Sequence, residues 1–173
     1  MEGELRTLSL SDELTSLYNR RGFFALVDQL LKVSRRVKEG LFLLYADVDN
    51  LKAINDTYGH REGDMVLVEI AHILKENYRE SDIIARIGGD EFVVIPVGSE
   101  GDDTAVITAR LKKCIDIHNA EVKRRYNVSI STGISYYDPL NPCSVHELLA
   151  RGDQAMYEEK NLKRKLRLSV SGK

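Results

Sequence analysis

Acidic side chains stand at the ends of two expected strands. Asp47 closes the apolar run Leu41–Val48, and Asp90 and Glu91 directly follow the glycine pair 88–89. A buried carboxylate is costly without a partner, and two that face each other across neighbouring strands repel unless a cation lies between them. Carboxylate oxygens select Mg²⁺ or Mn²⁺, ions that also bind phosphate oxygens. The pattern therefore predicts a divalent metal site with Asp47 and Asp90 as ligands.

The alternation of side chains along a strand limits this site. Successive residues point to opposite faces, so Asp90 and Glu91 are not both expected to reach Asp47. We expect Asp90 to be the inward ligand, with Glu91 beside it where the turn rotates the chain. Each acid alone fits an ordinary cap or ion pair at a sheet edge. Taken together, Asp47 before the paired glycines and Asp90 and Glu91 after them favour a metal site over a cap or an ion pair.

A second polar cluster follows Asp47 and contains Lys52, Asn55, His60 and Asp64. A lysine can balance phosphate charge. A carboxylate can accept hydrogen bonds from the paired N–H groups of guanine, and an amide can both donate and accept. The cluster thus favours guanine over adenine, although a turn rich in Asn, Asp and Gly is itself common.

Hydrophobic periodicity predicts the elements that carry these residues. A helix begins after Asn19 as N-cap and ends at Gly40, and the glycine pair 88–89 predicts a tight hairpin with positive φ at both positions. Ser144 and Glu147 form a capping box. The remaining helices are expected at 51–57, 63–78, 105–118 and 144–165, and the strands at 41–48, 83–87, 92–97 and 128–137.

This order predicts one α/β (α+β) domain, in which helices surround a central mixed sheet that contains an antiparallel hairpin. Its 173 residues and 43% hydrophobic content suffice for a single core. The net charge of −2 argues against nucleic-acid binding. Two distant cysteines give no metal spacing, and we find no signal peptide and no apolar run long enough to cross a membrane. We expect a cytoplasmic location and no membrane contact by this segment.

Four motifs in order resemble the GGDEF domains, the diguanylate cyclases of bacteria. The signature itself is Gly88-Gly89-Asp90-Glu91-Phe92. An N-terminal motif covers 12–23, a nucleotide-binding segment covers 47–64, and Tyr157 with Lys160 match the last helix. The resemblance spans about residues 11–166, which implies a linker remnant at 1–11 and a single catalytic domain at 12–170 with a nucleotidyl-cyclase-like palm fold.

The resemblance implies roles at matching positions. Two GTP molecules are condensed to cyclic di-GMP with release of two pyrophosphates, when a 3′-hydroxyl attacks an α-phosphate across a pair of domains. The resemblance implies that Asp47, Asp90 and the Val48 carbonyl bind Mg²⁺ or Mn²⁺. It implies that Asp90 is the proton acceptor and that Glu91 and Lys52 are the other catalytic groups. The groups that it implies for binding GTP are Asn55, His60, Asp64, Lys160 and Arg164.

Arg79 and Asp82 resemble the family's inhibitory site, where cyclic di-GMP binds and stops activity. Implied partners are GTP, a second GGDEF domain and an N-terminal regulatory domain in a longer protein. Lys163 and Lys165 depart from the family, which often has Gly and Asn beside Arg164. Two other functions stay open, a non-catalytic sensor of GTP or cyclic di-GMP and a related nucleotidyltransferase without guanine preference.

Overall fold

The computed structural model describes residues 9–98 and 104–172, so most of the expected linker at 1–11 lies outside the described residues. Five helices and four strands lie within these ranges. In chain order they are α1 (Arg20–Val37), β1 (Leu41–Val48), α2 (Leu51–Tyr58), α3 (His60–Asn77), β2 (Ile83–Arg86), β3 (Glu91–Ile95), α4 (Thr104–Val122), β4 (Ile130–Tyr137) and α5 (Val145–Ser171).

The sheet has the strand order β2-β3-β1-β4, and each pairing of these strands is antiparallel. The expected sheet was mixed, and this detail is wrong for the four strands. The parallel pairing that the described residues show is an isolated bridge between Tyr18 and Ala85. Strands joined by a helical crossover, β1 with β2 and β3 with β4, run in the same direction but are separated in the sheet by an antiparallel strand. Periodicity alone does not reveal this order.

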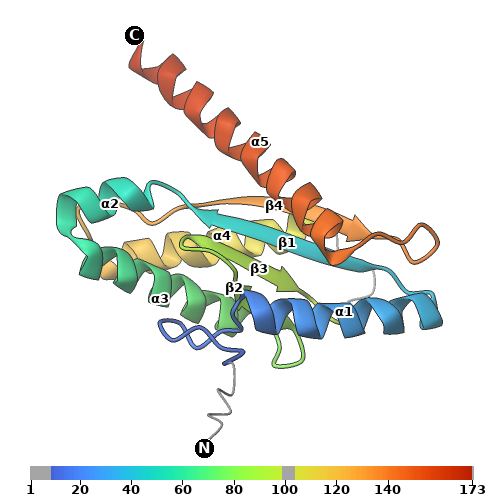
Figure 1. The fold of residues 1–173 in the computed structure, drawn as a ribbon. Helices are drawn as coiled ribbons and strands as arrows, with labels where there is room; N and C mark the ends of the chain where they lie inside the picture. Colours follow the sequence, from blue (N-terminus) through green and yellow to red (C-terminus); the bar gives the residue numbers. More distant parts are fainter. Residues whose placement is uncertain (1–8, 99–103, 173) are drawn as a thin grey trace, which may run out of the picture.

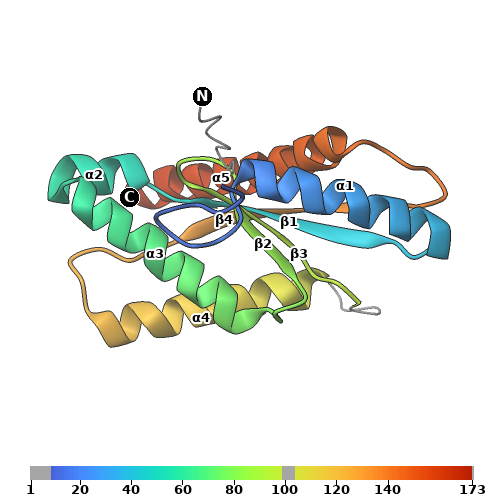
Figure 2. The same cartoon turned by 60° about the horizontal axis from the view of Figure 1, so that its bottom comes forward.

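Two helical layers enclose the sheet. Figure 2 shows α1 and α5 on one face and α3 and α4 on the other. Because side chains alternate along β1, Leu43 and Tyr45 pack with the α1 and α5 side, while Leu44 and Ala46 pack with α3 and α4. Asp47 continues the first set and therefore points towards α5.

Three local details differ from expectation. The left-handed residue that ends α1 is Lys38, with φ of 59°, not Gly40. The hairpin between β2 and β3 forms, but neither Gly88 nor Gly89 has positive φ, because a four-residue loop closed by the Ile87 amide and the Glu91 carbonyl replaces a two-residue turn. Helix α5 runs to Ser171 and projects beyond the sheet (Figure 1).

Asn19 caps α1 by accepting from the Gly22 amide at 2.9 Å, and Ser144 caps α5 by accepting from the Glu147 amide at 3.1 Å. Both expected caps are therefore found. Among the described helices, none combines the length and apolar character that a bilayer crossing requires.

Candidate active site

Three carboxylates converge where β1 ends and β3 begins. Oxygen atoms of Asp47, Asp90 and Glu91 lie within 4.8 Å of one another. Asp47 and Glu91 are direct partners in the sheet register, and Asp90 lies in the loop before β3. The expectation that alternation keeps Asp90 or Glu91 away from Asp47 is wrong, because a loop residue is not bound by strand alternation.

The Asp47 carboxylate is only partly satisfied by the protein. Its Oδ2 accepts from the Lys160 ammonium at 3.0 Å, while its buried Oδ1 has no hydrogen-bond partner. Burial raises the pKa of Asp47 to about 7, the neighbouring Asp90 adds to the increase, and Lys160 opposes it. The site therefore holds more negative charge than the described residues neutralise.

Two neighbours, Gly88 and Tyr45, flank the Glu91 carboxylate. Its carboxylate lies against Gly88, where an added Cβ would come within 2.4 Å of Oε2. It also lies within hydrogen-bonding reach of the Tyr45 hydroxyl. Burial raises the pKa of Glu91, and the hydrogen bond from Tyr45 opposes this. Gly88 thus leaves room for the carboxylate that follows it.

Hydrogen bonds attach the loop between β2 and β3, which contains Gly88 and Gly89, to the rest of the domain. Arg86 donates to the Gly89 carbonyl at 2.8 Å and pairs with Asp12 at 3.2 Å. The Val48 amide donates to the Asp90 carbonyl at 3.0 Å. Val48 is buried as a whole residue, so its side chain offers nothing to a ligand. An added Cβ at Gly89 would meet nothing within 4 Å, so this position stays open to a ligand.

The donor set fits a small divalent cation. A buried, unpartnered carboxylate oxygen and two further carboxylates within 4.8 Å supply hard oxygen ligands and excess negative charge. Asp47 and Asp90 are the residues that would hold Mg²⁺ or Mn²⁺, with Glu91 adjacent.

The second predicted cluster lies on α2 and α3. Lys52 and His60 are exposed near the first turns of these helices. Asn55 packs on Gly63, where an added Cβ would come within 1.7 Å of Asn55 Oδ1, and this buried oxygen has no partner. Asp64 follows Gly63 and is exposed. The close contact of α2 with α3 therefore gathers Asn55 and the segment that carries Asp64.

Arg79 and Asp82 lie away from the acids, at the end of α3. They line a cavity of about 500 Å³ together with Tyr18, Lys75 and Tyr78. Both oxygens of Asp82 already accept hydrogen bonds, from the Arg79 amide at 2.7 Å and the Val97 amide at 2.8 Å. Asp82 thus shapes the turn, while the Arg79 side chain is exposed beside the cavity.

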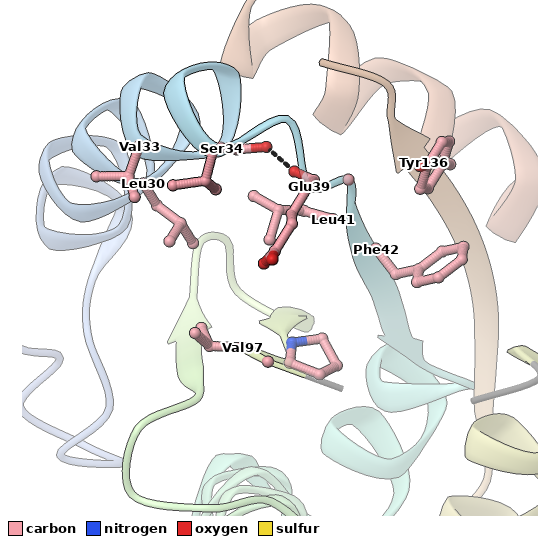
Figure 3. A pocket seen from close by; sticks show the side chains of 12 residues that line it. Leu30, Val33, Ser34, Glu39, Leu41, Phe42, Val97 and Tyr136 are labelled. Carbon is pink, nitrogen blue, oxygen red and sulfur yellow. Dashed lines mark hydrogen bonds between the residues drawn. The ribbon is translucent and has the colours of Figure 1, made fainter. Parts of the chain in front are cut away.

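Another cavity, of about 570 Å³, lies near the beginning of β1 and contains none of the predicted site residues (Figure 3). Leu30 and Val33 of α1, Leu41 of β1 and Val97 supply apolar walls, and Glu39 points into the space. Asp47 lies at the other end of the same strand, so this cavity is separate from the acidic cluster.

Sequence reasoning missed the residues that support the acids. Arg86 and Tyr45 read as ordinary strand residues, although each stands two positions from a signature residue, Gly88 and Asp47 respectively. Lys163 departs from the family pattern, which gives no sign that its ammonium pairs with Asp49 at 2.9 Å. For Arg86 and Tyr45, the signal in the sequence that could have identified them is their closeness to the motifs.

An antiparallel sheet between two helical layers, with acids gathered beside a glycine loop, is the architecture of a metal-assisted, palm-like nucleotidyl cyclase domain. The family model described as "Diguanylate cyclase, GGDEF domain" matches residues 9–166. The chain belongs to this family.

Its relatives include the bifunctional diguanylate cyclase/cyclic di-GMP phosphodiesterase MucR of Pseudomonas aeruginosa, 37% identical over 158 residues, covering 91% of this chain and 23% of MucR. Diguanylate cyclase DgcP of Escherichia coli is 33% identical over 159 residues, covering 91% and 46%. The chain thus spans less than half the length of either relative.

Among solved structures, the coiled coil and GGDEF domain of DgcB from Caulobacter crescentus in complex with c-di-GMP superposes with a TM-score of 0.77 at 26% identity. The match covers 88% of this chain and 81% of that one. The shared fold agrees with the family assignment.

Proposed function

We propose that this chain is a diguanylate cyclase domain, which condenses two GTP molecules into cyclic di-GMP and releases two pyrophosphates. The observation that carries the proposal is the convergence of Asp47, Asp90 and Glu91 within 4.8 Å beside an intact glycine signature. The named activities of the relatives support the same reaction. We assign the activity to a single domain of residues 12–170, with 1–11 as a linker.

Asp47, Asp90 and the Val48 carbonyl are the proposed ligands of Mg²⁺ or Mn²⁺. When bound, such an ion polarises the α-phosphate and makes the 3′-hydroxyl more acidic. Asp90 accepts the proton of that hydroxyl, with Glu91 beside it in the space that Gly88 leaves open. The exposed loop position at Gly89 admits the phosphates without a clash.

Cationic side chains offset the charge of the phosphates and of departing pyrophosphate. Lys52, Lys160 and Arg164 are the proposed groups. Lys160 pairs with Asp47. We infer that it exchanges this partner for the phosphates when GTP and metal bind, since the metal then neutralises the carboxylate.

The guanine base is assigned to Asn55 and Asp64, with His60 in the same pocket. The unpartnered Oδ1 of Asn55 supports this assignment, because a buried acceptor without a donor is costly unless a ligand supplies one. Asp64→Ala is expected to raise the KM for GTP while removing discrimination against ATP.

Each domain binds one GTP, so each attacking hydroxyl comes from the GTP of a second domain. The active form is therefore an antiparallel pair of domains, placed in the cytoplasm and controlled by an N-terminal regulatory domain in the longer protein. Cyclic di-GMP inhibits through the exposed guanidinium of Arg79 and the cavity beside it, with Asp82 holding the turn.

The decisive experiment is incubation with GTP and Mg²⁺ and measurement of pyrophosphate and cyclic dinucleotide. Asp90→Ala is expected to abolish both products and leave the melting temperature nearly unchanged, because Asp90 lies in a loop. Wild-type turnover by this variant would overturn the assignment of proton acceptor and ligand. A wild-type chain that binds GTP but releases no pyrophosphate would instead be a sensor.

A further inference from the structure

The position of Lys160 depends on how α5 is attached to the sheet. The buried residues of this helix end at Met156, and every later described residue of the chain is exposed or half-buried. Lys160 therefore lies one turn beyond the last apolar anchor. A rotation of about 10° around that anchor would move the Lys160 backbone by ~1 Å, since four helical residues span about 6 Å.

Polar contacts replace apolar packing in this turn. Glu159 accepts from the Thr132 amide and pairs with Lys112 of α4. Lys160 pairs with Asp47, and Lys163 pairs with Asp49 at 2.9 Å while also donating to the Ile130 carbonyl. Two lysines on successive turns of α5 thus contact two acids at the end of β1.

Hydrogen bonds from other residues hold the Asp49 carboxylate in position to accept from Lys163. Its side chain is 6% exposed, and its carboxylate also accepts from the Ser131 hydroxyl at 2.6 Å and from the Ser129 hydroxyl. The Asp49 amide donates to the Ser129 carbonyl at 2.8 Å. The acid is consequently held by the backbone of β1 and by the chain leading into β4, and its position does not depend on α5.

We propose that Asp49 and Lys163 are positioning residues, which fix the direction of α5 and so hold the Lys160 ammonium at the metal-binding carboxylates. Lys163 touches neither substrate nor metal in this assignment. The inference rests on the proposed function for its catalytic consequence, but the placement of Lys160 is testable without catalysis.

The test compares Lys163→Ala with Lys165→Ala. Both variants remove one positive charge from α5, but Lys165 is exposed and makes no ion pair with any residue in the described ranges. Lys163→Ala is expected to fold, because Asp49 keeps both serine hydroxyls. Lys163→Arg, which retains a cation of similar reach, serves as the rescue variant.

The first measurement is acetylation of Lys160 by N-hydroxysuccinimidyl acetate without nucleotide, quantified by peptide mass spectrometry. An ammonium held on a carboxylate reacts slowly. Lys163→Ala is expected to raise the rate about threefold or more, as expected for weakening of a partly exposed ion pair. Lys165→Ala and Lys163→Arg should match the wild type. An unchanged rate in Lys163→Ala overturns the proposal.

The second measurement is the kinetics of product formation. A displacement of ~1 Å at a charged group is expected to lower kcat of Lys163→Ala by about 10- to 100-fold. Lys163→Arg should recover most of the loss, and Lys165→Ala should stay within about twofold of the wild type. Faster acetylation with wild-type kinetics would overturn the positioning role. If the wild type itself forms no product, the proposed function fails, and acetylation alone decides the placement.

Discussion

At the scale of single residues, the acidic cluster contains a buried carboxylate oxygen, Asp47 Oδ1, without a hydrogen-bond partner. Burial favours protonation of Asp47, and its Oδ1 lacks any donor, although the fold supplies Lys160 to the other oxygen. Protein interiors leave few buried polar atoms unpartnered, and those that remain are often ligand sites. These features support the divalent metal site proposed above.

Removal of one ligand tests this directly. Asp47→Asn is expected to weaken Mn²⁺ binding, followed by electron paramagnetic resonance of the free ion, by at least about tenfold, because one charged oxygen ligand is lost. Asp116→Asn is the matched control, since Asp116 is an exposed acid on α4. Equal affinity in both variants would contradict the metal site.

Glu69 is a carboxylate that stabilises the fold by linking two helices. It pairs with Arg124 and with His118 at 3.2 Å, which joins α3 to α4 and to the segment after it. Burial raises the pKa of Glu69, but the hydrogen bond from Arg124, with His118 beside the same carboxylate, outweighs it and holds the pKa below its usual 4.5. Its stabilising contribution is therefore full above that value and is lost as the pH falls through the lower folded-state pKa.

Glu69→Gln is expected to lower the free energy of unfolding at pH 7 by about 1–2 kcal/mol, a value reduced by partial exposure of the pair. The difference from the wild type should disappear in acid, below the lowered folded-state pKa of Glu69. Urea unfolding at several pH values measures it. Glu76→Gln, which removes an exposed acid on α3, should show no such dependence.

At the scale of elements, close backbone contact sets the place of α5. An added Cβ at Gly133 would lie 2.2 Å from the Met156 nitrogen and 2.3 Å from the Gly152 oxygen. These are backbone atoms, which cannot rotate away as a flexible side chain can. Glycine in β4 thus allows α5 to lie directly on the sheet, one turn before the lysines that reach Asp47 and Asp49.

Gly133→Ala is expected to destabilise the domain by about 2–3 kcal/mol through overpacking, measured by urea unfolding. Gly89→Ala is the paired variant, because its Cβ meets nothing and its φ is not positive. We expect Gly89→Ala to keep stability within about 1 kcal/mol of the wild type while lowering product formation. Unchanged product formation by Gly89→Ala would show that the space around Gly89 is not reserved for a ligand.

At the scale of the whole molecule, one domain supplies one acidic cluster. The proposed reaction closes two phosphodiester bonds between two nucleotides, so it requires two such clusters facing each other. A pair in which one member lacks Asp90 retains one proton acceptor and should form only one bond.

Mixing the wild type with an equal amount of Asp90→Ala is therefore expected to produce a linear dinucleotide alongside the cyclic product, detected by liquid chromatography and mass spectrometry. Mixing with Asp116→Asn should yield cyclic product alone. If no linear product forms and the amount of cyclic product is unchanged at every mixing ratio, a single domain closes both bonds.

Local sequence determined most of the elements. Periodicity located every helix and strand, with bounds within a few residues except at the end of α5, which runs to Ser171 and not to 165. The N-caps at Asn19 and Ser144 were predicted from short-range chemistry. Such features depend on residues a few positions apart, which a pattern records. The motifs around Asp47 and Asp90 likewise identified the acids, because metal-binding residue types are recognisable without coordinates.

The tertiary structure decided what depends on distant contacts. Strand order places an antiparallel strand between each two strands that a helical crossover joins, so the sheet is antiparallel where a mixed sheet was expected. Glu91 joined Asp47 through sheet register, and Lys163 met Asp49 across 114 positions of sequence. Pairings of this kind leave no local pattern, because the energy that selects them arises only when β1, β4 and α5 have packed together.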